Sequence, residues 1–251
     1  MDNPPIVSVI MPTYNSSTVV SLSIESIINQ TFRDWELIIT DDCSEDDTVE
    51  ILNHWAKQDN RIKVLRLENN EGAGAARNNS ILQAKGRFIA FCDSDDLWSR
   101  NKLEVQIHFM LSNQVLLSFS NYDIIDEKGN FIKHVIARRR ISYSDLLKNN
   151  YIGCLTVVYD SEFLGTRTFP HLRKRQDWLL WLEILKDVDF AYGINESLAY
   201  YRKGKSTISS NKWSLLKYSW LVYNKELNFG ILKSVKHIIM FMFYYIRKKI
   251  E

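Results

Sequence analysis

The sequence predicts an α/β fold: a mostly parallel central sheet with helices on both of its faces. Short β-branched and apolar runs alternate four times with segments whose apolar residues recur at helical spacing. Polar clusters follow three of the runs, at residues 12–15, 41–47 and 92–96. The carboxyl ends of parallel strands share one edge of the sheet, where ligands usually bind. The three clusters therefore predict a single site at that edge.

The first two strand–helix pairs occupy residues 6–58. Residues 6–11 form an apolar, β-branched run between two prolines, which is typical of a buried strand. In the helix expected next, four apolar residues share one face: Val20, Ile24, Ile27 and Ile28. Residues 35–40 repeat the strand pattern, and a helix is predicted over 48–58, with capping residues in the polar cluster before it.

The next two pairs begin with strands at residues 62–67 and 87–91. A helix is expected between them, near residues 75–84, and another begins near Ser99. From residue 112 the pattern changes to two extended segments around a turn at 128–130, then to mixed strands and a helix that ends near Lys186. We interpret 112–205 as an α+β elaboration of the same sheet, so that 1–205 form one domain.

Composition restricts the class of protein. With 251 residues, 45% of them hydrophobic, the chain can form a large core. The cysteines Cys43, Cys92 and Cys154 lack metal-ligand spacing and are odd in number, which argues against a zinc site or a disulfide framework and favours a reducing compartment. No basic segment followed by an apolar stretch opens the chain, so we expect no secretory signal and a cytoplasmic location.

Residues 206–251 are expected to form an amphipathic helical tail. From Arg202 onward eleven Lys and Arg residues face two acids, a net charge of +9, and aromatic residues are interleaved with them. The apolar run 238–246 is too short to span a bilayer, which needs about 20 residues. The tail could lie in the interface of an anionic membrane. The alternative is a helix that packs on the rest of the chain or on another subunit.

Three carboxylates directly after a buried strand, Asp93, Asp95 and Asp96, are the sharpest chemical feature. Carboxylates this close repel one another unless a cation offsets their charge. One acid could cap the following helix, but three acids are unexplained by capping. We therefore predict a divalent cation, Mn²⁺ or Mg²⁺, held by these carboxylates together with the phosphates of a substrate.

Other candidate residues are ambiguous by pattern alone. Asp41 and Asp42 either support the local loop or accept hydrogen bonds from a ligand, and the glycine-rich stretch before Arg77 suits a phosphate but matches no nucleotide-binding fingerprint. Asp177 either complements a helix dipole or acts as a base. The basic run 138–140 is interpreted as a solvated loop, because no nucleic-acid motif accompanies it.

Five motifs, in order, carry a resemblance to a known family: "VSVIMPTYN", "QTFRDWELIITDDCSEDDT", "GAGAARN", "AFCDSDDLW" and "QDWLLWL". Over residues 5–202 the chain resembles the family 2 glycosyltransferases with the GT-A fold, inverting enzymes that build bacterial surface polysaccharides such as O-antigen and capsule. The resemblance implies that residues 1–111 bind a nucleotide sugar and that 112–205 supply the acceptor site and the catalytic base.

The resemblance also implies roles for single residues. Pro12, Tyr14 and Asp42, with Arg77 nearby, would hold the nucleotide of a UDP-sugar. Asp93 and Asp95 would be the acids of the DxD motif, with Asp95 as the direct ligand of Mn²⁺ or Mg²⁺, and Asp177 would be the base. Two departures stand out: Gln176 replaces a common glutamate, and Lys203 or Gly204 stands where a histidine is common.

The implied reaction moves a sugar from the UDP-sugar to a hydroxyl of a saccharide linked to polyprenyl diphosphate. The protein would act at the cytoplasmic face of the membrane, held there peripherally by its tail, and without a nucleic-acid partner. A sugar nucleotidyltransferase is the alternative enzyme, but "PTYNSSTV" replaces its glycine-rich opening. A non-catalytic nucleotide-sugar-binding protein is the third hypothesis, and the presence of both Asp95 and Asp177 argues against it.

Overall fold

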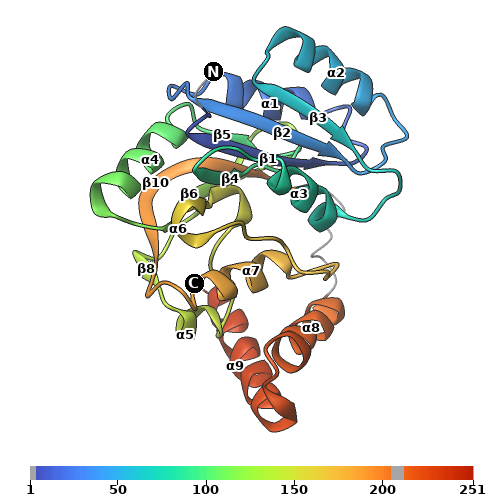
Figure 1. Cartoon of the computed structure of the whole chain (residues 1–251). Helices are drawn as coiled ribbons and strands as arrows, with labels where there is room; N and C mark the ends of the chain where they lie inside the picture. The colour runs from blue at the N-terminus through green and yellow to red at the C-terminus, as the bar shows by residue number, and fades with distance from the viewer. Residues whose placement is uncertain (1–3, 205–211, 251) are drawn as a thin grey trace.

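The computed structural model describes residues 4–204 and 212–250. One large twisted sheet forms the upper part of the molecule, and a pair of tail helices lies below it (Figure 1). The strand order is β3-β2-β1-β4-β9-β6-β10-β5, with β7 beside β6 and β8 beside β10. The strands span β1 Val7–Thr13, β2 Trp35–Asp41, β3 Ile62–Arg66, β4 Phe88–Phe91, β5 Leu97–Trp98, β6 Leu117–Ile125, β7 Phe131–Val135, β8 Arg140–Ile141, β9 Val158–Asp160 and β10 Ala191–Arg202.

The predicted α/β class is confirmed, and β1 to β4 are parallel. The second half is more mixed: β9 runs antiparallel to both β4 and β6, whereas β10 runs parallel to β6. Strand β9 has only three residues and therefore has no period that a sequence pattern could reveal. It nevertheless joins the two halves into a single sheet, because it is the strand between β4 and β6.

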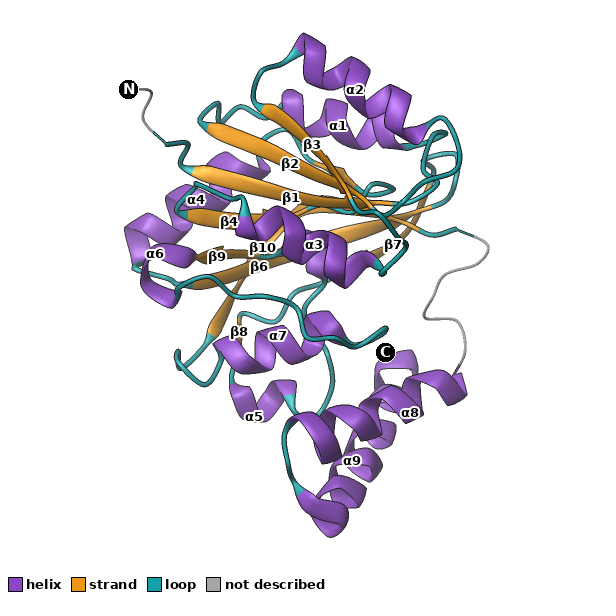
Figure 2. Ribbon diagram, turned by 45° about the vertical axis from the view of Figure 1, so that its right-hand side comes forward, coloured by secondary structure: helices purple, strands orange, loops and turns teal. Residues whose placement is uncertain are grey.

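Helices cover both faces of the sheet (Figure 2). Apolar residues of α1, α2 and α4 pack on one face, while those of α3, α5, α6 and α7 pack on the other. The helical segments span α1 Val20–Ile28, α2 Thr48–Gln58, α3 Ala73–Leu82, α4 Lys102–Asn113, α5 Tyr143–Leu146, η1 Cys154–Thr156, α6 Ser161–Leu164, α7 Gln176–Ile184, α8 Lys212–Leu221, η2 Val222–Glu226 and α9 Gly230–Ile250.

Most expected elements are present, with shifts at their ends. Helix α2 has the predicted bounds, and α3 begins two residues earlier than expected. Helix α4 begins at Lys102 rather than near Ser99, because Leu97 and Trp98 first pair with β10 as the short strand β5.

Most of helix α7 is buried. Residues 178–182 and Ile184 are buried, while Gln176, Asp177 and Glu183 are partly buried. The reason is the tail, which covers the side of α7 that faces away from the sheet. Apolar residues on more than one side of a helix are expected where both sides are covered.

The tail packs on the α/β unit through a small aromatic cluster. Tyr223 and Phe241, both buried, lie with ring centroids 5.4 Å and 5.9 Å from that of Trp178. The Tyr223 hydroxyl donates a 2.6 Å hydrogen bond to the backbone oxygen of Leu147. The tail therefore packs on the rest of the chain, as one of the two hypotheses for it predicts. Among the described residues, no helix is long and apolar enough to cross a membrane.

Candidate functional site

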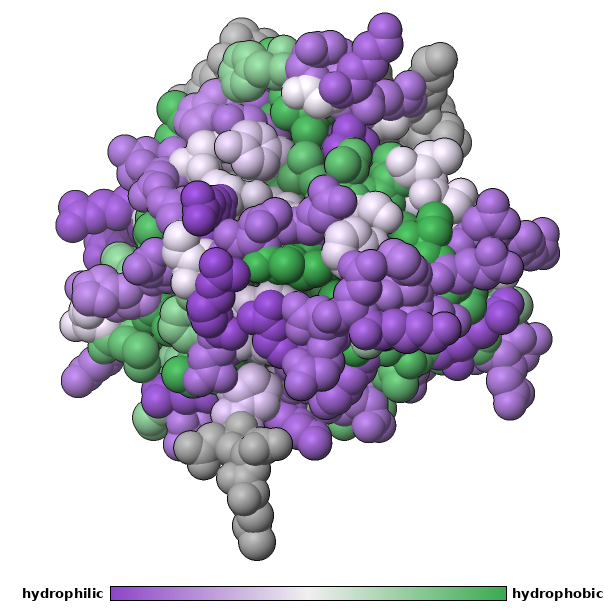
Figure 3. Space-filling model, turned by 90° about the horizontal axis from the view of Figure 1, so that it is seen from above, coloured by the Kyte–Doolittle hydropathy of each residue, from purple (hydrophilic) through white to green (hydrophobic). Residues whose placement is uncertain are grey.

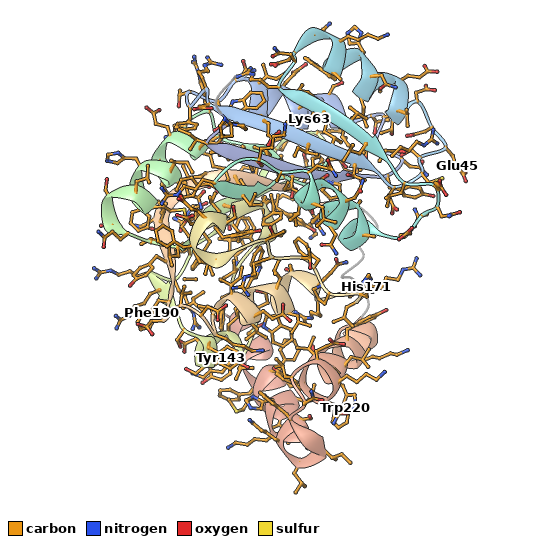
Figure 4. The ribbon with its side chains drawn as sticks, in the orientation of Figure 1. Glu45, Lys63, Tyr143, His171, Phe190 and Trp220 are labelled. Carbon is orange, nitrogen blue, oxygen red and sulfur yellow. The ribbon has the colours of Figure 1, made fainter. Side chains whose placement is uncertain are left out.

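The three polar clusters that follow β1, β2 and β4 meet at one edge of the sheet. The backbone N–H of Asn15 donates to Ser44 Oγ at 2.9 Å, and the Asn15 side chain accepts a hydrogen bond from the backbone of Glu45. Ser16 Oγ lies 2.9 Å from Ser94 Oγ, which links the first cluster to the third. Figure 4 labels Glu45 at this edge, where the strands end. The juxtaposition expected for a parallel sheet is confirmed.

Asp41 and Asp42 have different surroundings although they are adjacent. Asp41 is fully buried and accepts hydrogen bonds from the backbone and hydroxyl of Ser44, so it supports the loop. Asp42 accepts the backbone N–H groups of Glu71 and Gly72 at 2.7 and 2.8 Å, one on each oxygen. Desolvation raises the pKa of Asp42 despite these two donors. Its carboxylate thus ties the end of β2 to the glycine-rich loop.

Pro12 lies inside β1, whereas Tyr14 lies just after its last residue. Pro12 is buried within the strand and pairs with Thr40 of β2. Tyr14 is one residue beyond the strand, and its side chain is 45% exposed. Tyr14 therefore presents its aromatic ring to a ligand, whereas Pro12 is covered by the sheet.

Arg77 and Asp93 form a short ion pair in the site. Arg77 lies on α3, which follows the turn at Gly72 with its positive φ of 91°, and its Nη2 is 2.6 Å from Asp93 Oδ1. The arginine side chain is nearly buried, and burial alone would lower its pKa. The negative charge of Asp93 outweighs that effect and raises the pKa, so the guanidinium stays charged.

Asp95 and Asp96 are adjacent but differ in solvent exposure and in hydrogen bonding. Asp95 reaches solvent, yet desolvation by the surrounding protein and the charge of Asp93 raise its pKa to about 6. Asp96 is buried, with 2% exposure, and its Oδ1 accepts the backbone N–H of Arg202 at 3.0 Å. The third carboxylate is therefore a support of the loop, while Asp93 and Asp95 remain at the surface of the site.

Arg202, at the end of β10, holds this loop from the far half of the chain. Its Nε donates to the backbone oxygen of Asp95, and its Nη1 donates to the backbone oxygen of Glu127, both at 3.0 Å. In the sequence, Arg202 is only the first basic residue of the positively charged C-terminal segment. Its contact with a loop more than a hundred residues away has no signal in the local pattern.

Asp177 lies in the first turn of α7 and is partly buried. Asn150 Nδ2 donates a 2.9 Å hydrogen bond to Asp177 Oδ2. The neighbouring Gln176 points toward α3, because a Cβ added at Gly74 would lie 2.0 Å from its Oε1. The starts of α3 and α7 therefore lie against each other.

Charge interactions bring the base candidate into the same site as the ion pair. The negative charges of Asp93 and Asp177 both help to raise the pKa of Arg77. The Cys154 thiol, whose pKa is raised by burial, also interacts electrostatically with Arg77, Asp93 and Asp177. Groups from α3, the end of β4, η1 and α7 thus lie close enough to interact electrostatically, and three of the predicted residues are among them.

The carboxylates fit a hard divalent cation only in part. Within residues 4–204 and 212–250, no three His, Cys, Asp or Glu side chains are arranged to hold a metal. Asp93 and Asp95 supply oxygen ligands, the type that Mn²⁺ and Mg²⁺ prefer, and leave most coordination positions to other donors. Such a donor set suits a cation that shares its coordination with the phosphates of a bound nucleotide.

The sequence profile described as "Glycosyl transferase family 2" matches residues 8–171. A putative teichuronic acid biosynthesis glycosyltransferase, TuaG of Bacillus subtilis (strain 168), is 45% identical over 222 residues, 88% of each chain. The Escherichia coli enzyme named UDP-Glc:alpha-D-GlcNAc-diphosphoundecaprenol beta-1,3-glucosyltransferase WfgD is 45% identical over 217 residues, 86% of this chain and 84% of that protein.

Two solved structures share the fold. Staphylococcus aureus TarS 1–349 in complex with UDP-GlcNAc superposes with a TM-score of 0.74 at 22% identity, covering 94% of this chain and 70% of that chain. The mannosyltransferase PcManGT from Pyrobaculum calidifontis, in complex with GDP-Man and Mn²⁺, has a TM-score of 0.66 at 17% identity, covering 95% and 69%. The profile match and the relatives show that the chain belongs to glycosyl transferase family 2, as a glycosyltransferase of the surface-polysaccharide type.

Proposed function

We propose that this protein transfers a sugar from a UDP-sugar to a hydroxyl of a saccharide linked to polyprenyl diphosphate, with inversion of the anomeric carbon. The observation that carries the proposal is the placement of Asp177, which is held by Asn150 and interacts electrostatically with Arg77 of the Arg77–Asp93 pair. A carboxylate on a rigid helix start, next to a charged site at the strand ends, suits a general base beside a nucleotide sugar.

The donor would occupy the edge where the three clusters meet. The exposed ring of Tyr14 can stack on the base, and Pro12 lies two residues before it, within β1. Asp42, although it accepts two backbone N–H groups, keeps further lone pairs for a donor group of the nucleotide. Arg77 contributes a permanent positive charge near the diphosphate. A divalent cation held by Asp95 and Asp93 would neutralise charge on that diphosphate as it departs.

Asp177 would take the proton from the acceptor hydroxyl as its oxygen attacks the anomeric carbon. The new oxygen–carbon bond forms on the face opposite the nucleotide, and the bond from that carbon to the UDP oxygen breaks with its electron pair leaving on UDP. One displacement inverts the centre, so an α-linked donor yields a β-linked product. Asn150 occupies one Asp177 oxygen and leaves the other for the proton.

The names of similar proteins support the substrate class. WfgD is named for a UDP-glucose donor and a diphosphoundecaprenol-linked acceptor, and TarS was solved with UDP-GlcNAc. Membership of the glycosyltransferase family also argues against the nucleotidyltransferase alternative.

We also propose a peripheral location at the cytoplasmic face of the membrane, and helix α9 supports the contact with a membrane. Its inner side packs through Phe241, while an outer stripe of apolar side chains is exposed: Leu232 88%, Val235 43%, Ile239 62%, Met242 43% and Phe243 61%. Residues three and four positions apart share one face of a helix. Lysines lie in the same helix, at 233 and 236. In contrast, the opposite end of the molecule is mainly hydrophilic (Figure 3).

The test is a transfer assay with UDP-sugars and a diphosphate-linked saccharide, using wild type and Asp177→Asn. The wild type should form the product with inverted configuration. The variant should bind UDP normally but lose at least about a hundredfold in kcat, the usual contribution of a general base. Equal turnover by the two proteins would exclude Asp177 as the base, and loss of UDP binding in the variant would point to misfolding.

A further inference from the structure

Three cations, Arg138, Lys148 and Arg175, lie between the base Asp177 and the tail helix α9. They come from the segment between β7 and β8, the segment after α5, and the residue before α7. Figure 2 shows α5, α7 and α9 on the same side of the sheet. We call these three residues the basic seam.

Arg138 is the residue of the basic seam that contacts Tyr151, the neighbour of Asn150 in the chain. Its guanidinium carbon lies 3.6 Å from the ring centroid of Tyr151, and its side chain is exposed. Tyr151 is adjacent in the chain to Asn150, whose side chain donates to Asp177. Among the described residues, the charge of Arg138 is met by this tyrosine ring and not by a carboxylate. The arginine is therefore available to an anion close to the base.

Lys148 and Arg175 extend the positive charge toward α9. The charges of Arg138 and Lys148 both favour ionisation of the Tyr151 hydroxyl, although burial raises the pKa of that group overall. The hydroxyl also interacts with that of Tyr244 in α9. The guanidinium carbon of Arg175 lies 4.9 Å from the ring centroid of Phe241, one turn before Tyr244. The seam thus follows the inner side of α9, with Lys148 partly neutralised by Asp145 at 3.0 Å.

We propose that the basic seam binds the diphosphate of the acceptor, between the sugar at Asp177 and a lipid chain that leaves toward α9. This inference rests on the proposed function, since it concerns the acceptor of the same reaction. A diphosphate between a sugar and a prenyl chain needs cations at an intermediate position, and arginine suits phosphate oxygens through its planar fork of donors. The seam adjoins the base through Tyr151 and Asn150 and reaches α9 at Phe241.

A binding experiment tests the seam without turnover. Farnesyl diphosphate is titrated by calorimetry into the protein saturated with UDP and Mn²⁺, so that the donor site is already filled. The wild type should bind the probe, and Arg138→Gln should weaken binding about tenfold, as expected for one charge-assisted contact. The matched control is Arg139→Gln, because Arg139 is also exposed and is the adjacent residue. Equal affinity of wild type and Arg138→Gln would overturn the proposal.

A kinetic experiment distinguishes the seam from the function on which it rests. The same saccharide is offered on a prenyl diphosphate and on a neutral alkyl group. Arg138→Gln should raise the KM for the first acceptor about tenfold and leave the KM for the second unchanged. Transfer to both acceptors with equal KM in the wild type would refute the seam and retain the glycosyltransferase activity. Failure to use any UDP-sugar would instead refute the proposed function.

Discussion

Asn150 Nδ2 donates to Asp177 Oδ2 at 2.9 Å, so the base candidate is oriented by a residue from a different part of the chain. Asn150 also accepts the backbone N–H of Ile152 at 3.2 Å, which fixes its amide orientation. Asp177 is therefore held by a side chain that is itself held by the backbone.

Replacing Asn150 should lower turnover without weakening donor binding. Asn150→Ala removes the orienting bond, and we expect kcat to fall about tenfold with an unchanged affinity for UDP, the scale of a lost hydrogen bond to a charged group. Asn150→Asp places a second negative charge beside Asp177, which should shift the acidic limb of the pH–rate profile upward. Pre-steady-state rates over pH 5 to 9 check both effects.

An unchanged pH profile in Asn150→Asp would contradict contact between the two side chains. The control is Asn113→Asp, an exposed asparagine whose side chain bonds only to its own helix. That substitution should leave both kcat and the profile as in the wild type.

Arg202→Lys should weaken metal-dependent UDP binding. The lysine cannot keep both side-chain hydrogen bonds, to the backbone oxygens of Asp95 and Glu127, so the carboxylate loop loses its support. We expect UDP affinity in the presence of Mn²⁺ to fall about tenfold by calorimetry, equivalent to one or two lost hydrogen bonds. Arg100→Lys, at an exposed position, is the control. Equal affinity in Arg202→Lys would show that the loop holds its shape alone.

Metal dependence is tested at the carboxylate that reaches solvent. Asp95→Ala should abolish the increase in UDP affinity that Mn²⁺ or Mg²⁺ produces in the wild type, because it removes the proposed direct ligand. Titrations with and without each metal measure the increase. The same increase in Asp95→Ala and wild type would exclude Asp95 as a ligand.

Lys102 should make stability depend on pH. The side chain is fully buried, its Nζ donates to Gln106 Oε1 at 2.6 Å, and desolvation lowers its pKa to about 7. The unfolded chain therefore binds one more proton than the folded chain between that value and its ordinary pKa, about 10.5. The unfolding free energy of the wild type, relative to Lys102→Met, should rise over this range and stay level below it.

Denaturant titrations of the two proteins at intervals from pH 6 to 10.5 measure this difference. The steepest change should approach about 1.4 kcal/mol per pH unit. A difference that does not vary with pH would mean that Lys102 keeps its proton in the folded state.

The tail makes two separable predictions, of which the first concerns packing. Tyr223→Phe leaves the buried oxygen of Leu147 without its 2.6 Å hydrogen bond, and should lower the unfolding free energy by about 1–3 kcal/mol. Tyr218→Phe is the control on the neighbouring helix α8. Thermal unfolding measures the stability of both variants. An equal loss of unfolding free energy in the two would refute the hydrogen bond from Tyr223 to Leu147.

The second prediction for the tail concerns its binding to a membrane. The wild type should sediment with vesicles that contain anionic lipid at low salt, and release as salt screens the charge. Leu232→Glu with Ile239→Glu should abolish sedimentation without changing UDP affinity, because both side chains are exposed. A wild type that stays in the supernatant at low salt would contradict the membrane assignment, whereas the packing of Tyr223 would be unaffected.

Local patterns in the sequence determined the α/β class, the helix over residues 48–58 and the meeting of three polar clusters at one edge. They did so because period and strand polarity are local properties, and parallel strands must end together. The five motifs also identified the family. The division at residue 205 and the separate role of each site residue stay predictions.

Tertiary structure alone decided which of these side chains support the site and which face it. Asp93, Asp95 and Asp96 are equivalent in sequence, but only Asp96 is buried against Arg202. Asn150 meets Asp177, and the tail covers α7, through contacts between segments distant along the chain. Such contacts depend on how whole elements pack, and the spacing of residues within any one segment carries no information about them.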